Sequence, residues 1–222
     1  RKRSTKVLPM YKFLIPLFAL AILVSCTPQK GTQNGSSSNS ATSVSASTTS
    51  TMNPLSKSPT GFDGKLLSGK HTVTLKTSMG DITVEIDADK APKAATNFIT
   101  LSKMGYYSGL TFHRVIPNFM IQGGDPSGNG TGGESVFGPT FADEISDLKF
   151  APGTLAMANR GPNTNGSQFF ITVGATDWLQ GGYTIFGHVT AGMDVAEKIA
   201  GVQRDANDKP LAPVTFTPEV KN

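Results

Sequence analysis

The segment from Phe112 to Asp125 constrains the fold of this 222-residue chain more than any other stretch of its sequence. It has the pattern of two short β-strands separated by Pro117-Asn118, a dipeptide typical of turns. Alternation groups polar and large apolar residues on one face of each strand: Phe112, Arg114 and Ile116 in the first, and Met120 and Gln122 in the second. Such a segment is either a half-buried hairpin whose arginine pairs with a surface carboxylate, or the wall of an apolar pocket with two fixed hydrogen-bonding groups.

Segments with the same period of two recur from residue 71 onward, separated by turn-forming Gly, Pro, Asn and Asp. We expect strands at 71–77, 81–86, twice within 112–122, and at 153–159, 167–173, 183–189 and 214–216. Apolar residues at helical spacing predict one helix that begins near Pro92 and ends at Gly105, and a second at 193–200. Many short strands and only two helices favour a closed or sandwiched β architecture.

The strand predicted at 167–173 has a second face on which polar and aromatic residues mix. Alternation gives a core face and a mixed face, the first with Phe169, Ile171 and Val173, the second with Gln168, Phe170 and Thr172. Gln168 is therefore either a cross-strand hydrogen-bonding residue or part of a binding site. Trp178, in the turn that follows, is either a core residue or the lining of a site between strands.

The sequence lacks clear examples of several patterns that mark common binding and catalytic sites. Its three histidines are too scattered to suggest a cluster of metal ligands. Gly128, Gly130 and Gly133 have the spacing of a dinucleotide-binding loop, but no helix pattern follows them, so we interpret them as a structural loop. No Ser-His-Asp set and no carboxylate pair is recognisable.

The basic character of the chain is concentrated in its first residues. Residues 1–25 hold five of the 20 basic side chains and none of the 16 acidic ones, so the remainder has a net charge of −1. That remainder has no basic patch that would suggest a nucleic-acid partner.

An apolar run at 13–24 follows these basic residues, and the only cysteine, Cys26, comes directly after it and Ser25. Its helix would span about 18 Å of a hydrocarbon core of about 30 Å, so we interpret residues 1–25 as a signal peptide rather than a buried helix or a membrane anchor. Residues 23–26 resemble a bacterial lipobox, which implies a lipid on Cys26. Residues 26–68 are rich in Ser and Thr and predict a disordered tether, which leaves 69–222 as the folded domain.

Four blocks of this domain together resemble a cyclophilin, namely residues 112–125, 130–133, 157–159 and 161–172. The resemblance implies a mainly-β fold, a closed eight-stranded antiparallel β-barrel capped by two α-helices. It also implies peptidyl-prolyl cis–trans isomerase activity (EC 5.2.1.8) on proline-containing polypeptides, without a cofactor or a metal. It further suggests a monomer, and Trp178 permits the binding of cyclosporin-type inhibitors.

The resemblance also implies roles for residues at matching positions. It implies that Arg114, Gln122 and Phe119 are catalytic. The residues implied to form the proline pocket, to hold the substrate backbone or to line the adjoining groove are Met120, Phe170, Leu179, Ala158, Asn159, Gln168, Trp178, Tyr183, His113 and Gly130. Tyr183 stands where the best-known members have histidine, and Arg160 replaces a small residue at the groove edge. We expect these departures to change sequence preference rather than chemistry.

Together these features predict a bacterial lipoprotein isomerase, anchored to the cell-envelope membrane through Cys26, with its domain on the extracytoplasmic side. The expected substrates are folding secreted or envelope proteins. One alternative is a proline-peptide-binding or chaperone module that uses the same groove without turnover. Another is adhesion through the Ser/Thr-rich tether.

Overall fold

A computed structural model describes residues 61–221, so the predicted signal peptide, Cys26 and most of the predicted tether lie outside the described residues. The strands are β1 (Lys70–Thr77), β2 (Gly80–Asp87), β3 (Leu110–Thr111), β4 (Arg114–Ile116), β5 (Met120–Gly123), β6 (Thr154–Met157), β7 (Phe169–Thr172), β8 (Ile185–Ala191) and β9 (Thr215–Val220). The helices are α1 (Pro92–Lys103), α2 (Met193–Ala200) and the 3₁₀ turn η2 (Asp177–Leu179). Phe62 lies upstream of residue 69, the predicted start of the folded domain. Its ring nevertheless packs 4.8 Å from that of Phe137 within the fold.

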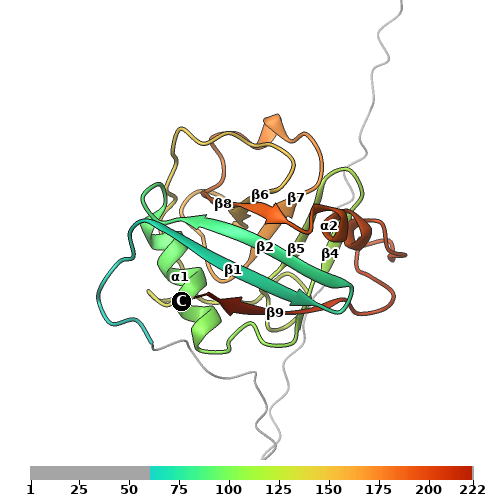
Figure 1. Ribbon diagram of the computed structural model, residues 1–222, viewed down its shortest axis with the longest axis horizontal. Coiled ribbons are helices and arrows are strands. Elements are labelled where there is room, and N and C mark those ends of the chain that lie inside the picture. Colours follow the sequence, from blue (N-terminus) through green and yellow to red (C-terminus); the bar gives the residue numbers. More distant parts are fainter. Residues whose placement is uncertain (1–60, 222) are drawn as a thin grey trace, which may run out of the picture. The chain divides into compact units, whose positions relative to one another are not determined.

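The described strands form one antiparallel sheet in the order β3-β9-β1-β2-β8-β6-β7-β5-β4, which curls around the core, with α1 and α2 on opposite sides of the β1–β2 hairpin (Figure 1). The mainly-β fold with two helices agrees with the prediction, but the closed eight-stranded barrel was wrong. The sheet has nine strands, and it ends at β3 and β4. The outer edge of β4 is covered by a loop instead of a strand, because Val115 N donates to Asp208 O at 2.8 Å.

The break between β3 and β4 also corrects the predicted face of Phe112. Phe112 does not share a surface with Arg114 and Ile116. Its ring lies 4.7 Å from that of Phe216 in the main core, whereas Ile116 packs against a second apolar cluster on the other face. Phe112 and His113 lie between the two strands and belong to neither, so the period-two alternation does not continue from β3 into β4.

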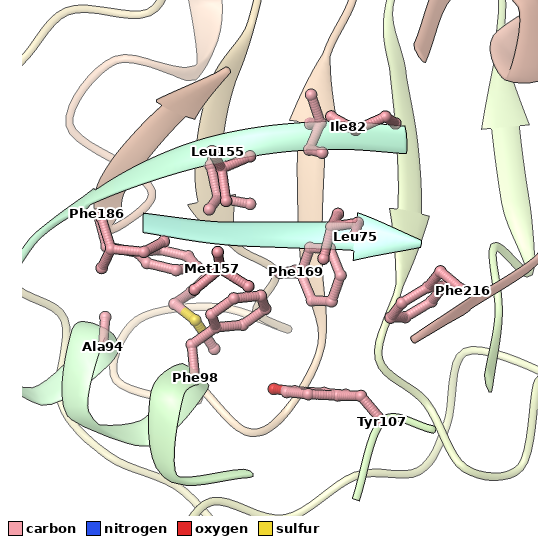
Figure 2. Close-up of a cluster of buried hydrophobic side chains, with 14 of the residues drawn as sticks. Leu75, Ile82, Ala94, Phe98, Tyr107, Leu155, Met157, Phe169, Phe186 and Phe216 are labelled. Atoms are coloured by element: carbon pink, nitrogen blue, oxygen red, sulfur yellow. The ribbon is translucent and has the colours of Figure 1, made fainter. Parts of the chain in front are cut away.

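The main core lies between the concave face of the sheet and α1. Phe98 of α1 is fully buried, and its ring contacts those of Tyr107, Phe169 and Phe186 at centroid distances of 5.3, 5.1 and 5.4 Å. Figure 2 shows these rings gathered between α1 and the strands. Burial of one such phenylalanine stabilises the fold by roughly 1.5–3 kcal/mol, so this aromatic cluster fixes α1 on the sheet.

The N-terminus of α1 is capped by a residue far away in the sequence. Ala91, at the N-cap position, makes no side-chain capping bond. Instead, the backbone N–H groups of Lys93 and Ala94 each donate to one carboxylate oxygen of Glu144 at 2.9 Å. The carboxylate satisfies two donors that a helix start leaves free, and its charge complements the helix dipole.

Two buried side chains connect this core to the loops that carry the candidate site. Asn97 of α1 donates to Gly166 O at 2.8 Å and accepts from Val136 N at 2.9 Å. The hydroxyl of Tyr107 donates to Ser167 O at 2.8 Å. The main core therefore fixes the backbone just before β7. Across the described residues, no helix combines the length and the apolar character that a bilayer span requires.

Candidate active site

A row of side chains crosses four neighbouring strands on the face of the sheet that is turned away from the main core. The strand register pairs Arg114 with Gln122, Gln122 with Phe170, and Phe170 with Ala156. Directly paired residues of an antiparallel sheet share a face, so the register alone places these side chains beside one another. The face predicted for Phe170 is confirmed, because Phe169 and Ile171 lie in the main core and Phe170 does not.

The apolar part of this face forms a second cluster. Its buried members are Met120, Phe150, Ala156, Phe170 and Ile185, with Ile116, Phe119, Leu148, Ala158, Leu179 and Tyr183 packed against them. The Phe170 ring stacks with Phe150 at 6.2 Å and meets Tyr183 edge to face at 5.5 Å. Because aromatic neighbours on two sides hold Phe170, its exposed surface is a rigid wall.

A groove of about 560 Å³ lies over this cluster. Residues predicted for the site that line it are His113, Arg114, Phe119, Met120, Gln122, Gly130, Ala158, Asn159, Phe170, Leu179 and Tyr183. Gln168 instead lines a smaller adjoining cavity of about 60 Å³, which Gln122, Gly130, Ala158 and Asn159 also line. Trp178 lines neither. It is 69% exposed, with its ring 5.8 Å from that of Phe119.

The carboxamides of Gln122 and Gln168 form one hydrogen-bonded unit. Gln122 Nε2 donates to Gln168 Oε1 at 3.0 Å. Gln168 Nε2 donates in turn to Gly130 O at 3.0 Å and to Gly132 O at 2.8 Å. Gln168 is therefore a cross-strand hydrogen-bonding residue, and its bonds fix Gln122 and the glycine-rich loop. Its predicted part in substrate binding stays a prediction.

That glycine-rich loop is folded around Asp125. Its carboxylate accepts backbone hydrogen bonds from Ser127, Asn129 and Gly130 at 2.8, 3.1 and 2.6 Å. Burial alone would raise the pKa of Asp125, but these backbone donors outweigh it, so its pKa is lowered and the carboxylate stays charged. The interpretation of the glycines as a structural loop therefore agrees with the geometry.

His113 differs from the other polar groups of the groove because only 5% of it is exposed and neither ring nitrogen has a hydrogen-bond partner within the described residues. Burial lowers its pKa, an effect that nearby Asp125 opposes, so the ring is neutral at pH 7. Asn159 uses its own side chain within the fold, where Nδ2 donates to Gly182 O at 2.9 Å. Its Oδ1 accepts from Gly161 N at 3.3 Å, so both ends of the Asn159 carboxamide bond within the fold.

Arg114 is the one charged residue of the row, and 42% of its side chain is exposed. Its only ion pair in the described region joins Nε to Asp208 Oδ2 at 3.8 Å. Arg114 therefore lines the groove beside its apolar wall, with its side chain accessible to solvent. Within residues 61–221, no three His, Cys, Asp or Glu side chains are grouped so that they could hold a metal ion.

The family model for cyclophilin-type peptidyl-prolyl cis–trans isomerases matches residues 72–218, which is most of the described region. The chain belongs to this family. The predicted family and its isomerase activity are thereby confirmed, and no sequence block of the cyclophilin motif lies outside the match.

Peptidyl-prolyl cis-trans isomerases from eukaryotes match about two thirds of the chain. A peptidyl-prolyl cis-trans isomerase of Dictyostelium discoideum (cypE) is 57% identical over 144 residues, which are 64% of this chain and 92% of the relative. The isomerase ppi1 of Schizosaccharomyces pombe is 53% identical over 144 residues, which are 64% of this chain and 93% of that relative. These relatives give no support to a bacterial lipoprotein form, which stays a prediction from the sequence.

Solved cyclophilin structures have the same fold. A Cryptosporidium parvum cyclophilin aligns with a TM-score of 0.68 and 40% sequence identity, and covers 69% of this chain and 99% of its own. The same protein, crystallised in the presence of the dipeptide Ala-Pro, aligns with a TM-score of 0.66 at 40% identity, and covers 68% of this chain and 99% of its own.

Several residues of the cyclophilin groove could not be found from the sequence. They are Gly128, Asn129, Asp205, Asn207 and Lys209. The last three belong to a loop far from the motif blocks, and its polar turn-forming residues look like those of any surface loop. Only the tertiary fold, which places this loop against β4, brings them to the groove.

Proposed function

We propose that this cyclophilin accelerates X-Pro rotation through a hydrogen bond from Arg114 to the prolyl nitrogen in the twisted transition state. The observation that carries the proposal is the row formed by Arg114, Gln122 and Phe170, which sets one accessible guanidinium beside the apolar wall of an open groove. An arginine is always charged and presents several donors, so it requires no general base to act.

The energy required is within reach of such a contact. Amide resonance gives peptide rotation a barrier of roughly 18–20 kcal/mol. In the twisted state the resonance is lost and the prolyl nitrogen regains its lone pair, so a donor binds that state more strongly than the planar one. A rate increase of about 10⁵-fold corresponds to about 7 kcal/mol, which a charge-assisted hydrogen bond and a fixed orientation together can supply.

The remaining groove residues then hold the substrate. The apolar wall of Phe119, Met120, Phe170 and Leu179 accommodates the proline ring. The side chain of Gln122 and the backbone of Asn159 bind the peptide backbone on either side of it. We assign the neighbouring positions at His113, Gly130, Ala158, Gln168, Trp178 and Tyr183 to contacts with the flanking substrate residues.

We further propose that the protein is a lipid-anchored form that acts on folding secreted or envelope proteins. The support is the sequence at residues 1–26, a basic and apolar leader that ends at Cys26. The tether would give the domain a mean reach of roughly 35 Å from the membrane. If this is right, the full-length chain fractionates with membranes, and Cys26→Ser releases it. Equal membrane association of both forms would contradict lipid attachment.

A measurement of cis–trans exchange separates the isomerase from a module that only binds proline peptides. Exchange cross-peaks of a short Ala-Pro peptide are recorded by NMR with and without catalytic amounts of the protein. The isomerase increases the exchange rate far below stoichiometric concentration. A binding module leaves the exchange rate unchanged there, and shifts the peptide resonances only near stoichiometric concentration. Trp178, the only tryptophan, lies on Phe119 and gives a fluorescence signal for titration with cyclosporin-type inhibitors.

A further inference from the structure

The loop at 203–211 is held in shape by Asp205. The backbone N–H groups of Asn207 and Lys209 donate to the Asp205 carboxylate at 2.8 and 3.0 Å. Asp205 N donates to Lys209 O at 2.8 Å, and Leu211 N donates to Gln203 O at 2.9 Å, which closes the loop. These bonds do not involve the side chain of Asp208, so that carboxylate is not needed to form the turn.

The Asp208 backbone is fixed against the strand that carries Arg114. Its φ of +62° is one that only glycine, asparagine and aspartate adopt readily. Its carbonyl accepts from Val115 N at 2.8 Å, one residue along β4 from Arg114. The carboxylate is therefore held at a set position relative to the groove.

From that position the Asp208 carboxylate joins two guanidinium groups. Oδ1 accepts from Arg204 Nε at 3.1 Å, and Oδ2 lies 3.8 Å from Arg114 Nε. Both contacts are made to Nε, at the inner end of each guanidinium. The terminal nitrogens of Arg114 stay available at the groove, and with two cations on one anion the cluster keeps a net positive charge.

We propose that Asp208 is a positioning residue that orients the Arg114 guanidinium for isomerisation. The inference rests on the role proposed above for Arg114. A long, half-exposed side chain samples many rotamers, and a contact to Nε selects those that direct its terminal donors into the groove. Half-exposed ion pairs contribute little to folding, so the effect should appear in turnover and not in stability.

Asp208→Asn and Asp208→Gly both remove the carboxylate. Both preserve the backbone, because asparagine and glycine tolerate positive φ. Asp194→Asn is the matched control, because Asp194 pairs with Lys198 at 3.1 Å on the surface of α2. For each full-length variant we would measure peptide exchange at saturation, peptide affinity and Tm. We expect exchange about threefold to tenfold slower in both Asp208 variants, affinity within about twofold of wild type, and an unchanged control.

A double-mutant cycle distinguishes positioning from a general structural effect. In the Arg114→Ala background, Asp208→Asn should cause no further loss of exchange. The Arg114 Nε–H resonance should also move or broaden in Asp208→Asn and not in Asp194→Asn. Wild-type exchange in both single variants, or an equal loss with and without Arg114, would overturn the inference. Full activity of Arg114→Ala alone would instead refute the role of Arg114 itself, and the positioning role with it.

Discussion

Gln168 is the residue whose replacement tests most fully how the groove is built. Its side chain makes three hydrogen bonds, one from Gln122 and two to the carbonyls of Gly130 and Gly132. Gln168→Met keeps the length and volume of the side chain but removes all three. The substitution therefore tests the polar unit without creating a cavity.

The expected loss of stability follows from that count. A net contribution of about 1 kcal/mol for each bond gives about 3 kcal/mol as an upper figure. The two glycine carbonyls are only half-buried, so water replaces part of what they lose, and we expect about 2 kcal/mol. Release of the Gln122 carboxamide and of the glycine-rich loop should also slow peptide exchange by about tenfold.

Urea unfolding and NMR exchange measure the two effects separately. Gln203→Met is the matched control, because Gln203 is exposed and its side chain makes no hydrogen bond in the described region. The denaturation midpoint should fall for Gln168→Met with an unchanged slope. A stability and an exchange rate both equal to those of the control would refute the polar unit as the element that orders the groove.

Two further predictions concern the loops and the pH dependence. Gly124→Ala would place a Cβ 2.5 Å from Ser167 O, so its Tm should fall. Gly64→Ala is the matched control, because Gly64 has nearly the same positive φ but open space around it. Equal Tm values for the two variants would contradict the steric argument. Burial lowers the pKa of His113 in the folded state, so stability should be full above the ordinary histidine pKa of about 6.5 and decline as the pH falls below it. His113→Asn should remove that part of the pH profile of unfolding, and an unaltered profile would show that His113 is not its source.

Local pattern was sufficient for most elements and for the centre of the site. Local sequence pattern predicted eight of the nine strands in the described region, most of them from period-two alternation and β6 from its run of buried residues. The helix expected at 193–200 has those bounds in the structure. The motif residues Arg114, Gln122 and Phe170 lie in one row because the sheet register aligns them, and alternation within each strand predicts the face.

What could not be predicted depends on contacts between distant segments. Glu144 caps α1 from 50 residues away, and no local signal marks it as a capping residue. The strand β3 has two residues, too few for a periodic pattern. Asp208 reaches Arg114 only because its loop covers the edge of β4. In each case the partner is decided by the tertiary fold.

The most direct test of the account is peptide exchange with Arg114→Ala, measured by NMR at saturating peptide, beside Lys198→Ala as a control for loss of an exposed cation on α2. We predict that Arg114→Ala binds the peptide within a few-fold of wild type, keeps its Tm, and loses most of its exchange activity, about 10²-fold or more. Lys198→Ala should exchange at the wild-type rate. An Arg114→Ala protein that binds the peptide and exchanges it as fast as wild type would contradict the central claim.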